Sequence, residues 1–308
     1  MSSKGEELRK LIAAPEITLQ PGVFNGFSAR LVEKLGYRTA FITGSGVSEN
    51  ALGWADMGVM GLDENVRVSR AIAECTNLLL IGDGDTGYGN PVNVFFTVRA
   101  FEGAGLAGVM IEDQVWPKRC GHMAGKEVIP AEEMVEKIKA ACEGRRDPAF
   151  VLKARTDAAG PLGIPEAIKR LNLYAEAGAD LLFADAVLAA DDIGTLARNV
   201  PKPLAVNMGF GIRRRATTPL LSARQLQDLG VALAEYPRML TSAALRGMMN
   251  AMEAFARSVE TGEVVDRPDL TVSFEELNDL MGFSFLTDLE RRHLSRGQLE
   301  SKYGATPR

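Results

Sequence analysis

The chain of 308 residues has little of several things that define special classes of protein. Its three cysteines, an odd number in a chain this long, do not predict a disulfide framework. No apolar stretch approaches the ~20 residues needed to span a bilayer. The polar, charged start, MSSKGEELRK, is unlike a signal peptide. These features predict a cytoplasmic protein without a membrane partner.

A strong excess of one charge is also missing. The 35 basic and 40 acidic residues give a formal charge of −5, and no long basic run occurs. Such a chain is a poor candidate for binding nucleic acid or an anionic membrane surface. With 46% hydrophobic and 24% charged residues, the composition is that of a globular protein rather than a disordered or low-complexity one.

Apolar, β-branched runs alternate with helix-like segments along the chain. Continuous apolar runs of this kind suit strands that are buried on both faces, as in parallel sheets. We expect strands at residues 17–23, 39–44, 78–85, 108–114, 149–156, 181–186, 203–208 and 231–236. We expect helices between them at residues 27–36, 66–76, 91–104, 132–143, 165–177, 191–199 and 222–229.

Eight strands that alternate with helices predict an α/β fold, a (β/α)₈ barrel of the TIM type. The main competitor is an open doubly wound sheet, but no G-x-G-x-x-G follows the first strand. An amphipathic helix is expected at residues 239–259, and a short helix-like piece at 274–292. We therefore expect a catalytic barrel over residues 1–260. A C-terminal helical tail, 261–308, would pack on the barrel or on a partner subunit.

Polar residues gather where the predicted strands end. In a (β/α)₈ barrel the active site lies at the carboxyl ends of the strands, and a purely structural barrel does not need polar groups there. The polar strand ends are Thr43–Gly46, Asp83–Asp85, Glu112–Gln114, Arg155–Asp157, Asp185 and Asn207. Converging carboxylates repel one another unless a cation joins them, so this edge of the barrel is the predicted site.

Three of these carboxylates suggest a metal site. Asp83 and Asp85 are alternate residues of one predicted strand, so they would point to the same side of the sheet. With Glu112 they form an all-oxygen set, which favours Mg²⁺ or Mn²⁺ over zinc. Because Mg²⁺ keeps several waters, one carboxylate would bind it directly and the others through water. Asp56, in the loop after the second strand, is either an outer member of this site or an ordinary turn or capping residue.

Residues at other predicted strand ends are suited to binding an anion. The Thr43–Gly46 turn offers backbone N–H groups and hydroxyls that would cradle a carboxylate or phosphate. Arg155 ends a buried strand, so an anionic ligand or a fixed carboxylate must pair with it. The arginine run 213–215 follows the seventh strand. At least one of its members would reach the distal end of a substrate, or the run is a solvated loop or a contact with a neighbouring subunit.

One cysteine is predicted to be chemical rather than structural. Cys120 lies in the segment KRCGH, and its basic neighbours should favour the thiolate and raise its reactivity. Cys75 and Cys142 fit small buried cysteines instead. His122 would pair with Cys120 or bind a substrate carboxylate.

Several phrases together resemble one group of enzymes. TGSGVS, GDGDTGYGN, IEDQVWPKRCGH, KARTDA and the TTPL at 217–220 are similar to the isocitrate lyase and phosphoenolpyruvate mutase superfamily. The resemblance runs from about residue 5 to about residue 290, and the short bacterial 2-methylisocitrate lyases show the closest pattern. It implies a Mg²⁺-dependent barrel, usually a homotetramer that exchanges C-terminal helices between subunits.

The resemblance also implies a role for each carboxylate. Asp85 would be the principal Mg²⁺ ligand. Asp83, Asp56 and Glu112 would hold the waters of the ion, and Lys118 would lie beside it.

The remaining implied roles concern a small-molecule carboxylate substrate. Cys120 would be the general acid that protonates the leaving carbanion. The residues that would face the two carboxylates are Ser45, Gly46 and Arg155 at the α-carboxylate, and Gly121, His122 and Asn207 at the distal one. The implied reaction is a retro-aldol or retro-Claisen cleavage of a 2-hydroxy acid, which yields an α-keto acid such as pyruvate and a second carboxylate.

Two departures from the 2-methylisocitrate lyases leave the substrate open. Those enzymes carry glutamate where this chain has Asp185, and Thr-Glu where it has Met208-Gly209. Candidate substrates are methylisocitrate, dimethylmalate or another substituted malate, oxaloacetate and a carboxyphosphonate. Asp185 is a candidate both for substrate binding and, with Tyr37 and Tyr88, for the general base.

Three alternatives to the lyase remain at this stage. An oxaloacetate decarboxylase of the same superfamily does not need an acid of the Cys120 type. A carboxyphosphonoenolpyruvate mutase would share the KRCGH segment. A non-catalytic metabolite-binding barrel would be marked by loss of the metal or acid residues, and none is lost here.

Overall fold

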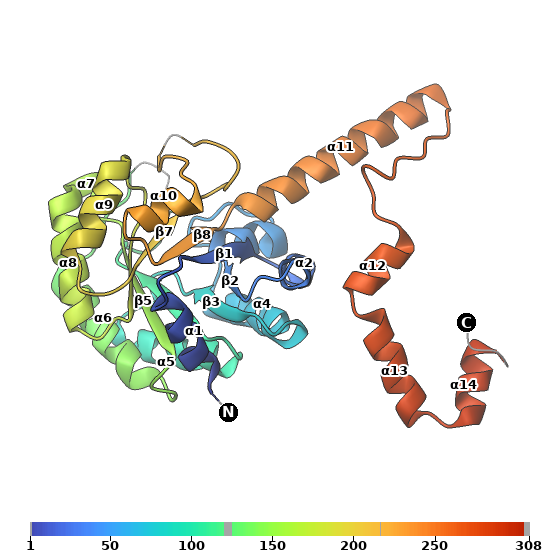
Figure 1. The fold of residues 1–308 in the computed structure, drawn as a ribbon, viewed down its shortest axis with the longest axis horizontal. Helices are drawn as coiled ribbons and strands as arrows, with labels where there is room; N and C mark the ends of the chain where they lie inside the picture. The colour runs from blue at the N-terminus through green and yellow to red at the C-terminus, as the bar shows by residue number, and fades with distance from the viewer. Residues whose placement is uncertain (1, 120–124, 216, 305–308) are drawn as a thin grey trace. The chain divides into compact units, whose positions relative to one another are not determined.

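In the computed structural model, which describes residues 2–119, 125–215 and 217–304, eight parallel strands close into a barrel in chain order (Figure 1). The strands are β1 (Thr18–Val23), β2 (Thr39–Ile42), β3 (Leu79–Asp83), β4 (Gly108–Glu112), β5 (Val151–Thr156), β6 (Leu181–Ala184), β7 (Leu204–Asn207) and β8 (Leu233–Tyr236). Each lies within a predicted apolar run, and β8 pairs with β1 to complete the circle. The prediction of a (β/α)₈ barrel is confirmed.

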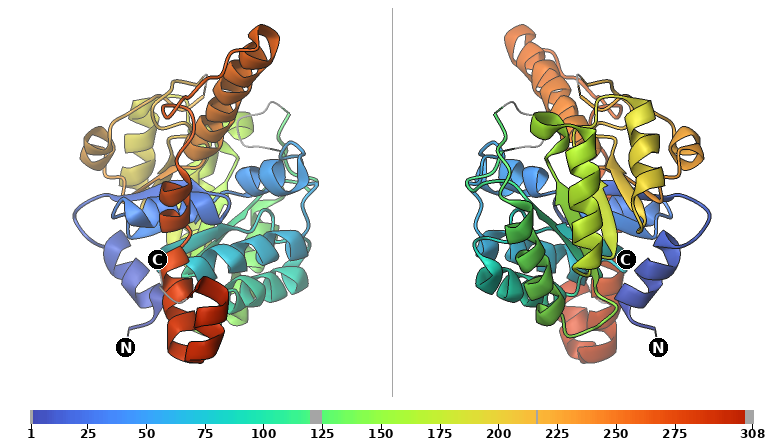
Figure 2. Two further views of the ribbon diagram at one scale, coloured as in Figure 1. Left: turned by 90° about the vertical axis from the view of Figure 1, so that its right-hand side faces the viewer. Right: turned by 90° about the vertical axis from the view of Figure 1, so that its left-hand side faces the viewer.

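Helices surround the barrel, and most occupy the predicted segments. The helices between strands are α2 (Gly26–Lys34), α3 (Gly44–Val47), η1 (Ser48–Leu52), α4 (Leu62–Cys75), α5 (Pro91–Gly103), α6 (Ala131–Gly144), α7 (Ala159–Leu162), α8 (Ile164–Glu176), α9 (Ala190–Asn199) and α10 (Ala223–Asp228). Helices α5, α6, α8 and α9 lie side by side on the outside of the barrel (Figure 2). Local chemistry fixes their ends: α5 begins where Asn90 accepts from Val92 N and Pro91 takes the first helical position.

Alternate residues of each strand belong to two hydrophobic layers. On β3, Leu79 and Ile81 join the cluster inside the barrel, whereas Leu80 joins the cluster beneath the helices. This is the period of two expected of a strand whose faces are both buried. The same alternation on β5, where Val151 points inward, places Lys153 and Arg155 on the inner face. Charged residues therefore enter the barrel interior at inward positions of a buried strand.

An amino-terminal helix that we did not predict, α1 (Lys4–Ile12), covers the end of the barrel where the strands begin. Ser3 and Glu6 form a capping box: each side chain accepts from the backbone N–H of the other, both at 3.2 Å. Leu8 and Ile12 are buried and belong to the cluster inside the barrel. Access to the interior is therefore from the opposite end, where the strands finish.

The chain divides into two compact units, residues 1–244 and 245–308, the second described as far as residue 304. The long helix α11 (Met239–Thr261) starts in the first unit, and α12 (Phe274–Leu280), α13 (Phe283–His293) and α14 (Arg296–Tyr303) belong to the second. None of the described residues of these four helices is buried. Large apolar side chains such as Met252, Phe255 and Phe285 are more than half exposed. Over the described ranges, no helix combines the length and apolarity needed to cross a membrane.

Candidate active site

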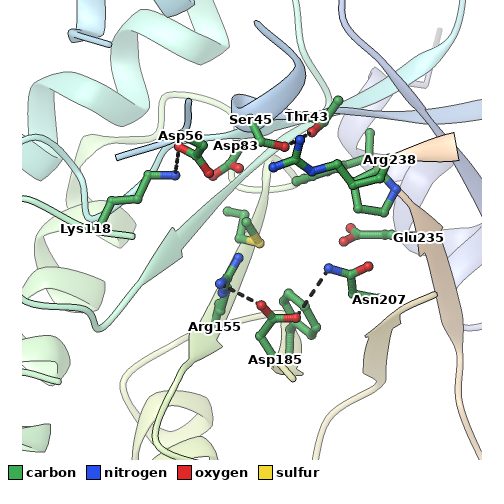
Figure 3. A pocket seen from close by; sticks show the side chains of 14 residues that line it. Thr43, Ser45, Asp56, Asp83, Lys118, Arg155, Asp185, Asn207, Glu235 and Arg238 are labelled. Atoms are coloured by element: carbon green, nitrogen blue, oxygen red, sulfur yellow. Dashed lines mark hydrogen bonds and ion pairs between the residues drawn. The ribbon is translucent and has the colours of Figure 1, made fainter. Parts of the chain in front are cut away.

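A cavity opens at the carboxyl ends of the strands. This is the position of the active site in barrels of this type. The predicted site residues that line it are Ser45, Asp56, Asp83, Lys118, Arg155, Asp185 and Asn207 (Figure 3). They come from β2 to β7 or from the loops that follow these strands, so the polar strand ends converge on one space.

Lys118 supplies a cation between two of the carboxylates. Its ammonium lies 2.6 Å from Asp56 Oδ1 and 2.7 Å from Asp85 Oδ1. Burial alone would lower the pKa of Lys118, but Asp85, Asp56 and Glu112 raise it well above its usual range. Asp56 therefore belongs to a buried cluster of charges and is not merely a turn residue.

Asp85 reaches this cluster by a route that differs from the prediction. We expected Asp83 and Asp85 to alternate along one strand, but β3 ends at Asp83 and Asp85 has φ +48°, in the left-handed region. The intervening Gly84 packs against β4 so closely that a Cβ would lie 2.7 Å from the carbonyl oxygen of Met110. The chain therefore turns here, and Asp85 N donates to Asp83 Oδ1 at 3.1 Å. A tight turn, rather than strand alternation, brings the two carboxylates together.

Two buried carboxylate oxygens have neither a hydrogen-bond partner nor an ion-pair partner among the described residues: Asp85 Oδ2 and Glu112 Oε1. Burial raises the pKa of Asp85 to about 7, although Lys118 opposes the rise. Burial likewise raises the pKa of Glu112 well above its usual range, against the charge of Arg155. Because unpaired buried carboxylates are costly, a hard cation would stabilise this cluster.

The donor set fits a hydrated Mg²⁺ better than an ion enclosed by protein ligands. Within the residues that the structure describes, no three His, Cys, Asp or Glu side chains are arranged to hold one ion directly. Mg²⁺ keeps several waters and uses one or two carboxylates. Asp85 and Glu112 offer oxygens of the right kind, and Asp83 and Asp56 are close enough to act on the charge of Asp85.

Arg155 is held by fixed carboxylates, one of the two kinds of partner expected for it. Its Nε and Nη2 donate to the two oxygens of Asp157, at 2.8 and 3.0 Å. Nη2 also donates to Asp185 Oδ2 at 2.8 Å, and Nη1 lies 3.3 Å from Glu112 Oε2. The guanidinium is thus oriented at the wall of the cavity before any ligand arrives.

Asp185 and Asn207 are joined across the same wall. Asn207 Nδ2 donates to Asp185 Oδ1 at 3.3 Å, and Asn207 Oδ1 accepts from Gly209 N at 2.7 Å. Arg215 donates to the carbonyl oxygen of Asn207 at 2.5 Å, whereas residues 213–214 are exposed. Of the arginine run, therefore, one member contacts a residue that lines the cavity.

The Thr43–Gly46 segment is the cap and first turn of the short helix α3 rather than an open turn. Thr43 Oγ1 lies 2.9 Å from Ser45 Oγ and accepts from Gly46 N. Gly44 N donates to Asp83 Oδ2 at 3.2 Å, and a Cβ at Gly44 would lie 2.7 Å from that oxygen. Part of the predicted anion cradle is thus used by a carboxylate of the protein, while Ser45 faces the cavity.

The sequence did not lead us to a buried ion pair between Lys153 and Glu235, the second of which lines the cavity. The Lys153 ammonium lies 4.9 and 4.5 Å from the ring centroids of Phe41 and Phe183. The signal available in the sequence for this pair was Lys153, a charged residue at an inward position of the otherwise largely apolar strand β5. Arg238, which follows β8 and also lines the cavity, was missed as well.

Some polar strand ends serve the scaffold instead of the cavity. Asp113 accepts from Thr156 Oγ1 at 2.7 Å and from Arg170 at 3.0 Å, which ties β4 to β5 and α8. Gln114 donates to the carbonyl of Arg119 and accepts from its N–H. These two bonds fix the loop as far as residue 119.

Cys120, Gly121 and His122 lie outside the described residues, so their implied roles remain predictions. The other two thiols, Cys75 and Cys142, are partly buried, and burial raises the pKa of both. A raised pKa disfavours the thiolate, as in a structural cysteine.

The three candidate bases differ in their placement. Asp185 lines the cavity. Tyr37 precedes β2 and so lies at the wrong end of that strand. Tyr88 accepts from Asn65 Nδ2 at 2.8 Å, and burial together with Asp85 raises its pKa well above its usual range. A general base needs a pKa near the working pH, so Tyr88 is unsuited to the role.

Comparison with known proteins agrees with this barrel fold. Residues 8–256 match the family described as phosphoenolpyruvate phosphomutase. The chain belongs to the phosphoenolpyruvate mutase and isocitrate lyase superfamily of enzymes, whose members include lyases and mutases.

Individual relatives cover nearly the whole chain. It is 37% identical to 2,3-dimethylmalate lyase of Eubacterium barkeri over 93% of this chain and 97% of the relative. It is 40% identical to the probable 2-methylisocitrate lyase 2 of Corynebacterium glutamicum, over 86% and 85%. A solved structure of oxaloacetate acetylhydrolase with the inhibitor 3,3-difluorooxalacetate superposes with a TM-score of 0.86 at 29% identity, over 94% of this chain and 96% of that one.

Proposed function

We propose that the protein is a Mg²⁺-dependent carbon–carbon lyase that cleaves a substituted 2-hydroxy di- or tricarboxylate. The substrate would resemble 2-methylisocitrate or dimethylmalate, and the products would be an α-keto acid such as pyruvate and a second carboxylate. The observation that carries the proposal is the pair of unpartnered oxygens on Asp85 and Glu112, beside a cavity with Arg155 in its wall. Lyases acting on both kinds of substrate are among the relatives.

In this proposal, Asp85 binds Mg²⁺ directly, and Asp83, Asp56 and Glu112 hold its waters. Mn²⁺ would serve in place of Mg²⁺, because both prefer oxygen ligands. The bound ion supplies Lewis acidity, which lowers the pKa of a substrate hydroxyl. Lys118, already paired with Asp56 and Asp85, balances the charge of the cluster.

In this proposal the substrate is bound by side chains and backbone groups that are already oriented in the cavity wall. Arg155 and Ser45, with the N–H of Gly46, would bind the α-carboxylate, and Asn207 would face the distal one. Because Asp157 and Asp185 already hold Arg155, little reorganisation is needed when the substrate arrives.

The protein's proton transfers would then use two side chains. Asp185 accepts the proton of the C2 hydroxyl, the C2–C3 bond breaks, and C2 becomes the carbonyl carbon of the α-keto acid. The electron pair of that bond stays on C3, and the thiol of Cys120 donates a proton there. His122 and Gly121 would help to bind the carboxylate of this fragment.

A mutase is the second candidate function, because the matched family is described as phosphoenolpyruvate phosphomutase. A decarboxylase is a weaker alternative, since decarboxylation of oxaloacetate does not call for an acid of the Cys120 type.

A substrate screen tests the proposal directly. We expect Mg²⁺-dependent release of an α-keto acid from 2-methylisocitrate or 2,3-dimethylmalate, measured by coupled detection of pyruvate or glyoxylate. Oxaloacetate and a carboxyphosphonate serve as the comparison substrates. Turnover of a carboxyphosphonate alone would favour the mutase, and turnover of oxaloacetate alone would favour the decarboxylase.

We also propose that the protein forms a homotetramer in which C-terminal helices are exchanged between subunits. The exposed apolar side chains of α11 to α13 support this, because faces of this kind are usually covered by a partner. We expect sedimentation equilibrium to give the mass of four chains. A monomer at micromolar concentration would contradict the proposal.

A further inference from the structure

The floor of the cavity carries one carboxylate among apolar side chains. Glu235 of β8 lines the cavity, and its carboxylate points into that space (Figure 3). Phe41, Met110 and Phe183 line the same cavity from inward positions of their strands. Each of these three comes two residues before a polar strand end, so they lie deeper in the barrel than the polar groups do. The floor therefore combines a charged acceptor with two aromatic rings.

A buried ammonium holds Glu235 in place. Lys153 of β5 donates to Glu235 Oε1 across the barrel, and both residues are only 1% exposed. The ammonium also lies within 5 Å of the ring centroids of Phe41 and Phe183. Burial raises the pKa of Glu235, but the charge of Lys153 opposes the rise. Oε1 is thus committed to Lys153, whereas Oε2 accepts no hydrogen bond from any residue that the structure describes.

A second buried polar group lies beside Glu235 in the strand pairing. Gln20 of β1 pairs in register with Glu235 and is fully buried. Leu19 and Val23 belong to the layer beneath the helices, so Gln20 takes an inward position. Among the described residues, neither its Nε2 nor its Oε1 has a hydrogen-bond partner. Because unpaired buried polar groups are costly, this part of the barrel favours a polar neighbour, either water or a polar group of a ligand.

We propose that Glu235 is a specificity residue that accepts a hydrogen bond from a hydroxyl group of the substrate, so that the cavity favours a hydroxyl-bearing substituent over an alkyl one. The inference rests on the proposed lyase function, because it takes the substrate to be a 2-hydroxy acid held by Arg155. A carboxylate repels a further carboxylate but accepts readily from a hydroxyl. The CH groups of the same substituent would pack against Phe41 and Phe183. A purely alkyl substituent would instead leave Oε2 desolvated and without a partner.

Binding of glycerate and lactate tests the inference without any reaction. Both are 2-hydroxy acids, they differ by one hydroxyl on C3, and neither has the second carboxylate that would stabilise a carbanion at C3. With Mg²⁺ present, we expect one enantiomer of glycerate to bind about 10-fold or more tightly than lactate of the same configuration, because a hydrogen bond to a charged group contributes a factor of this size. Titration calorimetry measures the four affinities. The other enantiomer directs C3 away from the floor and serves as an internal control.

A double variant removes the ion pair as a unit. Lys153→Met with Glu235→Leu replaces both charges by apolar side chains, which a buried site tolerates better than the loss of one partner. The preference for glycerate should fall below about 2-fold, because the charged acceptor is gone, while lactate binding is retained. A thermal melt checks the fold. The control, Lys139→Met with Glu136→Leu, removes an exposed ion pair of α6 and should keep the preference of the parent protein.

Turnover gives a separate readout. The parent enzyme should cleave 2-(hydroxymethyl)malate, which yields hydroxypyruvate and acetate, with a higher kcat/KM than 2-methylmalate, which yields pyruvate and acetate. Equal affinities for glycerate and lactate in the parent protein, a preference that the double variant retains, or a higher kcat/KM for 2-methylmalate would overturn the inference. If the parent enzyme cleaves no 2-hydroxy acid, the proposed lyase function fails, and the calorimetric comparison still decides the role of Glu235.

Discussion

Replacing Asp85 with asparagine is expected to abolish Mg²⁺-dependent turnover while leaving the fold intact. The amide keeps the size of the side chain but loses the charge that would hold the ion. Removing a buried carboxylate with one unpartnered oxygen should not destabilise the metal-free protein, and Lys118 keeps Asp56 as a partner at 2.6 Å. Calorimetric titration with Mg²⁺ and Mn²⁺, beside a thermal melt, separates loss of metal binding from loss of structure.

The matched control is Asp266→Asn, which changes an exposed aspartate in the second unit. It should bind metal and turn over like the parent enzyme. Full turnover by chelator-treated Asp85→Asn would refute the metal assignment.

Replacing Cys120 with serine is expected to lower kcat by at least about 100-fold while KM changes much less, because general acid catalysis typically contributes a factor of this size. A serine hydroxyl is a far weaker acid than a thiol, but it is close to the thiol in size. Steady-state kinetics on the substrate found in the screen, with a binding titration of the same variant, makes the distinction.

The control for this variant is Cys75→Ser, which alters a partly buried thiol on α4 whose pKa burial raises. It should retain activity. If Cys120→Ser kept a near-native kcat, the protonation role would be wrong, and decarboxylation would become the better interpretation.

The barrel was predictable because the burial of each strand is visible in the apolar residues of that strand. Runs such as those around Leu80 and Leu182 are apolar at successive positions, which happens when both faces of a strand are covered. Helix α1 was missed although its capping pair, Ser3 and Glu6, is visible in the sequence. The pair lies before the first strand, and the alternation of strands and helices that predicted the other helices begins only after it.

The sequence predicted which residues form the site better than it predicted how those residues are arranged. The rule that strand ends meet brought Asp83, Arg155 and Asn207 to one cavity, whereas the place of Lys118 was implied by the family resemblance. The turn at Asp85 was not predictable, because it depends on how closely Gly84 packs against β4, a contact between segments far apart in the chain.

Arg238 and Glu235 were missed for a related reason. Each belongs to the β8 region, which looked apolar and unremarkable, and their importance comes from the residues opposite them. Lys153 pairs with Glu235 across the closed barrel, over a separation of 82 positions in the chain. Spacing along a sequence does not reveal such pairs, because ring closure alone makes them neighbours.

The helix that covers the amino-terminal end of the barrel has a kinetic consequence. Leu8 and Ile12 belong to the same buried cluster as Phe41 and Phe183, so the described residues close the barrel at the end where its strands begin, and substrate and products must pass through the end where its strands finish. When molecules enter and leave a cavity through one end, the molecule that lies deeper cannot leave until the molecule nearer the opening has left. In a reaction that makes two products from one substrate, the fragment nearer the entrance must depart before the fragment nearer the carboxylate cluster, so the order of product release is built into the architecture of the barrel.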